Sequence, residues 1–190
     1  MFTVPTALTW ARILLIPLFV GVFFLPERTL VMADKNLTAS LVFIIAAVTD
    51  WLDGYLARTL NQTTAFGAFL DPVADKLMVA AALIMLVQLQ RVDTIVAFVI
   101  IGREITISAL REWMAKVGAS RSVAVSMIGK IKTSAQMTAI PMLLYYEPLL
   151  GVDIASIGRW LIWIAAVLTV YSMVYYMRRA WPELRARKAI

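Results

Sequence analysis

Four aspartates lie close together in a chain whose other residues are mostly apolar. A helix turns by about 100° per residue. At that rate Asp50 and Asp53 fall on one face of a helix, and Asp71 and Asp75 fall on one face of the next. An Asp at the centre of a membrane helix costs roughly 2.5–3.5 kcal/mol, so carboxylates in such segments need something that binds them. We expect two helices to present two carboxylates each to one shared cavity.

The expected cavity concentrates negative charge and offers only oxygen ligands. Carboxylates this close together either take up protons or bind cations. Oxygen ligands favour hard ions such as Mg²⁺ and Mn²⁺, and a pair of divalent ions would balance the charge of all the carboxylates. Such pairs commonly hold phosphate oxygens during an in-line displacement. The pattern therefore predicts two divalent cations, with these ligands: Asp50, Asp53, Asp71 and Asp75.

Small and basic residues accompany the carboxylates. Gly54, Ala57 and Gly67 leave room for a ligand, although the two glycines could also serve helix packing. Arg58 could bind a phosphate oxygen or anchor its helix at the membrane surface. The chain has no cysteine and no histidine. Thiol chemistry and imidazole ligands are therefore excluded, and acid–base work falls to carboxylates, Lys, Tyr or Arg.

The composition indicates a membrane protein. Of 190 residues 62% are hydrophobic, whereas soluble chains are about 45–50% apolar. We predict an all-α integral membrane protein with six transmembrane helices in a single domain, residues 1–190. Pro5 and Trp10 suggest a short N-terminal interfacial segment before the first span. The apolar runs lie at about 13–25, 37–52, 77–90, 92–109, 135–150 and 154–177.

Basic residues gather in two regions of the chain. They follow the last apolar run, and they surround the connection between the fourth and fifth runs. The positive-inside rule then places both termini, and the connections between spans two and three and between four and five, in the cytoplasm. The Asp pairs would lie at that cytoplasmic end. The net charge of +6 thus reflects topology and contact with anionic membrane lipids, and we expect no nucleic acid partner.

The motif D-x2-D-G-x2-A-R-x8-G-x3-D-x3-D, from Asp50 to Asp75, resembles the signature of the CDP-alcohol phosphotransferase family at every fixed position. Residues 4–17, 102–105, 108–113 and 129–137 resemble the bacterial branch of that family that makes phosphatidylglycerophosphate. The resemblance implies a six-helix enzyme that is usually a homodimer. It also implies a place in the bacterial inner membrane, with the active site facing the cytoplasm.

The resemblance also implies an activity and a role for each residue of the motif. The phosphatidyl group of CDP-diacylglycerol would pass to the hydroxyl of sn-glycerol 3-phosphate, with release of CMP. Asp75 would share the metal site and act as general base on the attacking hydroxyl. Asp50, Asp53 and Asp71 would hold the metals on the diphosphate. The residues implied to accept the CDP group are Gly54, Ala57, Arg58 and Gly67.

A dianionic acceptor phosphate needs cations of its own. The surplus basic residues near the same face are Arg103, Arg111, Lys130 and Lys132. The two arginines share a face if their helix is continuous, whereas the two lysines cannot both face the cavity on one regular helix. Each cation could instead serve topology or pair with an acidic neighbour, Glu104 or Glu112.

Two other functions fit parts of the pattern. The same chemistry could use another acceptor, such as inositol phosphate or phosphatidylglycerol. A cation- or proton-coupled transporter is the alternative from another class, because intramembrane carboxylates also mark ion pathways. Transporters often show repeated halves, and this chain has no second copy of the motif. The sequence therefore favours the enzyme.

Overall fold

The structure, a computed structural model, describes residues 4–59, 65–116 and 127–186. This part of the chain is helical, apart from turns and one isolated bridge between Leu149 and Val152. The all-helical prediction is confirmed. The six helices are α1 (Val4–Phe24), α2 (Met32–Thr59), α3 (Ala65–Gln88), α4 (Thr94–Lys116), α5 (Met127–Tyr145) and α6 (Ile154–Ala186).

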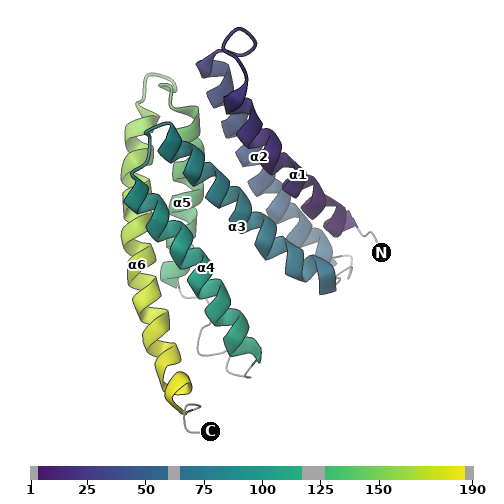
Figure 1. Cartoon of the computed structure of the whole chain (residues 1–190), viewed down its shortest axis with the longest axis vertical. Helices are drawn as coiled ribbons and strands as arrows, with labels where there is room; N and C mark the ends of the chain where they lie inside the picture. Colours follow the sequence, from purple (N-terminus) through teal and green to yellow (C-terminus); the bar gives the residue numbers. More distant parts are fainter. Residues whose placement is uncertain (1–3, 60–64, 117–126, 187–190) are drawn as a thin grey trace.

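The helices alternate in direction along the bundle (Figure 1). At one end of the bundle α1, α3 and α5 begin, and α2, α4 and α6 finish (Figure 1). We call this the carboxylate end, because it carries the Asp pairs of α2 and α3. The opposite end holds the turns from α1 to α2, from α3 to α4 and from α5 to α6. The two termini therefore lie at the same end as the carboxylates.

Three of the helices are long and apolar enough to cross a membrane. The qualifying windows are Ala7–Phe24, Met32–Asp53 and Ile154–Trp181, in α1, α2 and α6. Large apolar side chains also point outward elsewhere, for example Ile95 and Phe98 of α4. Such an outer surface suits contact with lipid rather than water. The structure thus agrees with a membrane protein.

Acidic side chains start two of the helices at the end opposite the carboxylates. The Asp93 carboxylate accepts a hydrogen bond from the backbone N–H of Ile95, 2.7 Å away, just as α4 begins. Asp153 accepts from the N–H (3.0 Å) and the hydroxyl (2.5 Å) of Ser156 at the start of α6. These bonds satisfy helix-end N–H groups. The bonds from Ser156 also lower the pKa of Asp153, because they favour its charged form.

The bundle core brings all six helices together. Its fully buried members include Phe19, Phe43, Leu83 and Ile100. The packing of α5 against α6 is especially close at Gly158, where an added Cβ would lie 3.0 Å from Leu143 Cγ. A second hydrophobic cluster packs the C-terminal halves of α4 and α6 together. That cluster comprises Ile107, Met114, Tyr176 and Ala180.

A buried arginine ties several helices together at the end opposite the carboxylates. The Arg91 guanidinium donates to the carbonyls of Leu143 (3.1 Å) and Leu144 (2.8 Å) and to Asn36 Oδ1 (2.8 Å). It also lies 4.2 Å from the centre of the Tyr146 ring. The last carbonyls of a helix lack partners within it, so this side chain completes the end of α5 while holding α2.

The start of the chain is part of a continuous helix. Residues 4–24 form α1, and its membrane-length window starts at Ala7. Thr9 and Arg12, in the stretch expected to lie along the membrane interface, are buried against acidic side chains of α2 and α3. The interfacial placement of this stretch stays a prediction.

Candidate active site

One turn of α1 contacts carboxylates from both α2 and α3. Arg12 Nη1 lies 2.5 Å from Asp50 Oδ1, and Arg12 Nη2 pairs with Asp53 Oδ2. The Thr9 hydroxyl donates to Asp71 Oδ1 at 2.5 Å. Residues three apart face the same side of a helix, so both α1 side chains point to the same place. Arg12 and Thr9 thereby link Asp residues of α2 and α3 through α1.

The remaining aspartate, Asp75, lies near Arg12. It lines a small cavity together with Arg12. The charges of Asp50 and Arg12 also act on its carboxyl group. The apolar walls of the cavity are Phe43, Ala46, Ala47, Met78, Val79 and Met137. Asp50, Asp53 and Asp71 therefore contact one turn of α1, and Asp75 lines a cavity beside it.

Arg12 is a site residue that the sequence analysis did not select. Its side chain is 1% exposed, that of Asp53 is 3% exposed, and that of Asp50 is 41% exposed. A buried charge is costly unless it is paired, and breaking a buried pair by removing one partner costs about 3–5 kcal/mol. The signal was available: a cation inside an apolar run needs a partner for the same reason as the aspartates do.

The donors suit a hard divalent cation, but the side chains are not arranged around one. Within the described residues, no group of three or more acidic side chains is placed to hold a metal ion. The Arg12 guanidinium instead supplies the positive charge between Asp50 and Asp53. The carboxylate oxygens are the ligands that Mg²⁺ and Mn²⁺ prefer. The two-metal site therefore stays a prediction. The chemistry of the carboxylate donors is compatible with it.

The residues expected to accept the CDP group are only partly described. Gly67 is buried near the start of α3. The backbone of α2 continues through Gly54, Ala57 and Arg58, but their side-chain surroundings lie outside the described residues. Their role in binding CDP stays a prediction.

Three of the expected acceptor-binding cations form a basic cluster, which we define as the buried Arg103 and Lys132 and the half-buried Arg111. The guanidinium carbons of Arg103 and Arg111 lie 5.8 Å and 5.3 Å from the Tyr176 ring centre. Both arginines thus share a face of the continuous helix α4, as their spacing predicted. Lys132 of α5 is 1% exposed, and the charges of both arginines act on it. The side chain of Lys130 lies outside the described residues.

Glu104 is the acidic partner of the basic cluster. Its Oε1 pairs with Lys132 Nζ and lies 3.5 Å from Arg103 Nη1. Its charge also acts on Asp75, which lines a cavity with Met137 of α5, the helix that carries Lys132. From the sequence, Glu104 was expected only as a possible partner for a basic residue. Glu112 pairs with Lys116 at 3.1 Å on the exposed side of α4.

The basic cluster has unused hydrogen-bonding capacity. In the described part of the chain, the buried Nε atoms of Arg103 and Arg111 lack a hydrogen-bond partner, as does Oε1 of Gln136 nearby on α5. Buried polar atoms without partners are rare in native proteins and require an explanation. Three cations face one carboxylate here, so the cluster also has excess positive charge. Both features suit a bound anion.

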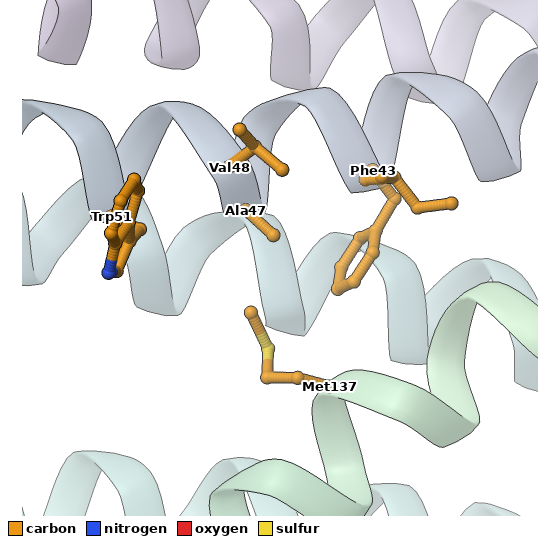
Figure 2. A pocket seen from close by; sticks show the side chains of 6 residues that line it. Phe43, Ala47, Val48, Trp51 and Met137 are labelled. Atoms are coloured by element: carbon orange, nitrogen blue, oxygen red, sulfur yellow. The ribbon is translucent and has the colours of Figure 1, made fainter.

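An apolar groove lies between α2 and Met137 of α5 (Figure 2). It has a volume of about 280 Å³. Met137 of α5 points toward α2, between Phe43 and Trp51 (Figure 2). Phe43, Ala47 and Met137 also line the small cavity that contains Arg12 and Asp75. The groove and the cavity therefore share a wall. The residues lining the groove are Phe43, Ile44, Ala47, Val48, Trp51 and Met137.

Comparison with known proteins agrees with this arrangement. The family model for CDP-alcohol phosphatidyltransferases matches residues 2–171. The chain is similar to the CDP-diacylglycerol–glycerol-3-phosphate 3-phosphatidyltransferases of Escherichia coli (strain K12), at 51% identity, and Salmonella typhimurium (strain LT2), at 50%. Each comparison covers 96% of this chain and 97% of the relative. The resemblance inferred from the motif is thereby confirmed, and the chain belongs to the CDP-alcohol phosphatidyltransferase family.

Proposed function

We propose that this membrane enzyme transfers the phosphatidyl group of CDP-diacylglycerol to sn-glycerol 3-phosphate, giving phosphatidylglycerophosphate and CMP. The names of relatives that are half identical over nearly the full chain support this activity. The observation that carries the proposal is that a largely buried basic cluster is linked electrostatically, through Glu104, to the carboxylate of Asp75. Glu104 pairs with Lys132 and Arg103, and its charge acts on Asp75. An acceptor with both a phosphate and a hydroxyl fits that pairing of sites.

The aspartates of α2 and α3 would hold two divalent cations, Mg²⁺ or Mn²⁺, against the donor diphosphate. Bound there, the ions would neutralise the diphosphate and polarise the attacking hydroxyl. Arg12 contacts Asp50 and Asp53, so it keeps these carboxylates paired when the donor is absent. The space for the CDP group would come from Gly54, Ala57, Arg58 and Gly67.

Asp75 would act as the general base. Its carboxylate accepts the proton of the acceptor hydroxyl while the hydroxyl oxygen forms a bond to the phosphatidyl phosphorus. The bond from that phosphorus to the CMP oxygen breaks, and its electron pair leaves with CMP. The apolar side chains around Asp75, among them Phe43 and Met78, would keep competing water away from the reaction.

The basic cluster would bind the acceptor phosphate. Arg103, Arg111 and Lys132 carry three positive charges, and Glu104 carries one negative charge, which leaves an excess of two. A phosphate monoester has a charge of about −1.5 to −2 near pH 7. The charges therefore match, and arginine can hold two phosphate oxygens at once. Lys130, on the same helix as Lys132, is the further candidate for this site.

The arrangement in the membrane follows from the helix directions and the charges. All six helices would cross the bacterial cytoplasmic membrane, with both termini and the carboxylate end on the cytoplasmic side. The basic residues near this end support that orientation under the positive-inside rule. The apolar groove beside α2 would take an acyl chain of the donor while its diphosphate reaches the carboxylates. We expect the enzyme to form a homodimer.

An acceptor panel tests the proposal. The purified chain in detergent micelles receives CDP-diacylglycerol, Mg²⁺ and one radiolabelled acceptor: sn-glycerol 3-phosphate, inositol phosphate or phosphatidylglycerol. We expect CMP and labelled lipid to appear with sn-glycerol 3-phosphate, and only in the presence of the metal. If transfer to inositol phosphate is faster than transfer to sn-glycerol 3-phosphate, the proposed acceptor is wrong. Ion flux in proteoliposomes without CMP release would instead favour a transporter.

A further inference from the structure

Glu104 has one anchored and one open carboxylate oxygen. Both of its pairings, with Lys132 Nζ and Arg103 Nη1, are made by Oε1. Within the described part of the chain, Oε2 makes no hydrogen bond or ion pair. The side chain is 24% exposed, so a ligand can reach it. The two cations fix the carboxylate while leaving an acceptor oxygen available.

Glu104 contacts one part of the proposed acceptor site and acts electrostatically on the other. It pairs with Lys132 and Arg103 of the basic cluster, which would bind the phosphate. Its charge also acts on Asp75, which would take the proton from the attacking hydroxyl. In sn-glycerol 3-phosphate the phosphate and the attacking hydroxyl occupy the two ends of a three-carbon chain. The middle carbon carries a second hydroxyl, which would lie beside Glu104.

We infer that Glu104 is a specificity-determining residue that accepts a hydrogen bond from the middle hydroxyl of the acceptor through Oε2. The inference rests on the proposed function and adds to it a residue that recognises the middle hydroxyl of the acceptor. A polyol monophosphate with a hydroxyl next to the phosphate-bearing carbon fits the site. An acceptor without that hydroxyl leaves a charged oxygen desolvated and without a partner.

A site built to bind a hydroxyl rejects an analogue that lacks it, because the buried polar group then has no partner. Hydrogen bonds to charged groups contribute enough for a preference of about 10- to 100-fold. The matched analogue is 3-hydroxypropyl phosphate, which keeps the phosphate and the attacking hydroxyl but has no middle hydroxyl. The ratio of kcat/KM for the two acceptors measures what Glu104 contributes.

The experiment compares the full chain with two variants in detergent micelles. Glu104→Gln keeps the size of the side chain and removes its charge, so we expect the preference for sn-glycerol 3-phosphate to fall to a few-fold. Glu112→Gln is the matched control, because Glu112 lies on the same helix and pairs only with the exposed Lys116 within the described residues. It should keep the full preference. Thermal melting, with and without inorganic phosphate, checks that each variant is folded and retains its phosphate site.

The outcomes separate this inference from the proposed function. An unchanged preference in folded Glu104→Gln, or equal use of both acceptors by the unaltered chain, would overturn the role of Glu104. If no acceptor gives CMP, the proposed function fails. In that case the role of Glu104 is tested by how far sn-glycerol 3-phosphate and 3-hydroxypropyl phosphate each raise the melting temperature of the protein. Stronger stabilisation by sn-glycerol 3-phosphate that depends on Glu104 supports the inference, and equal stabilisation overturns it.

Discussion

Arg12 forms an ion pair with Asp53 at a position where both side chains are almost closed to solvent. The guanidinium also reaches Asp50, so one cation of α1 contacts both carboxylates of α2. The pair explains how the acidic motif exists in an apolar chain before any substrate binds. It also places α1, which carries none of the motif, at the centre of the site.

Replacing Arg12 should destabilise the protein most when no metal is present. In Arg12→Gln the carboxylates of α2 lose their cation, and breaking such a buried pair costs about 3–5 kcal/mol. We expect a lower melting temperature in EDTA and a larger stabilisation by Mg²⁺ than in the unaltered chain. Arg159→Gln is the control, because Arg159 is exposed near the start of α6. Equal melting of Arg12→Gln and the unaltered chain in EDTA would contradict the role given to this pair.

Removing the general base should stop turnover without emptying the metal site. Asp75→Asn keeps an oxygen that can bind a cation, but an amide cannot take the proton. General base catalysis contributes roughly 10²–10⁴-fold, so CMP release should fall by at least about 100-fold. Mn²⁺ binding, measured by equilibrium dialysis, should remain. Asp34→Asn, at the start of α2, should behave like the unaltered chain. Near-normal CMP release by Asp75→Asn would remove Asp75 from this role.

Filling the apolar groove should affect long-chain donors selectively. In Met137→Trp the larger side chain would occupy the space between Phe43 and Trp51 (Figure 2). We expect KM to rise severalfold for CDP-diacylglycerol with long acyl chains and to change little for a donor with very short chains. Ile95→Trp, on the exposed face of α4, is the control. An equal effect on both donors would argue against an acyl chain in the groove.

The cluster around Arg91 should matter for stability and not for chemistry. Arg91→Gln removes charged donors from two carbonyls at the end of α5 and from Asn36. Leaving such buried groups unpaired costs about 1–3 kcal/mol each. The variant should melt at a lower temperature, while kcat per folded molecule stays unchanged because Arg91 lies at the end opposite the carboxylates. A large fall in kcat at a temperature where the variant is folded would show that the two ends are coupled.

The acidic motif could be predicted from sequence because its physics is local. Helical periodicity places Asp50 with Asp53 and Asp71 with Asp75, and the cost of a buried carboxylate says that they must share a partner. The same periodicity placed Arg103 and Arg111 on one face of α4, where both meet Tyr176. Helix directions, read from the distribution of basic residues, put the termini at the same end as the carboxylates.

The partners of the motif could not be predicted in the same way, because they come from distant parts of the chain. Arg12 is 38 residues from Asp50 and 41 from Asp53, and no periodicity links them. Glu104 adjoins Lys132 and Arg103 and also acts on Asp75, so its place depends on how α3, α4 and α5 pack. The burial of Thr9 and Arg12 was not predicted, because the acidic side chains that they meet lie on α2 and α3, far away in the sequence.

Electron paramagnetic resonance of bound Mn²⁺ tests most directly whether the aspartates of α2 and α3 act as one site. The full chain in micelles is titrated with Mn²⁺ and CDP-diacylglycerol, beside Asp53→Ala and the control Asp34→Asn. We predict two ions per chain with the spectrum of a spin-coupled pair. The coupling should be lost in Asp53→Ala and kept in Asp34→Asn. A single isolated ion, or a spectrum that Asp53→Ala leaves unchanged, would contradict a shared site.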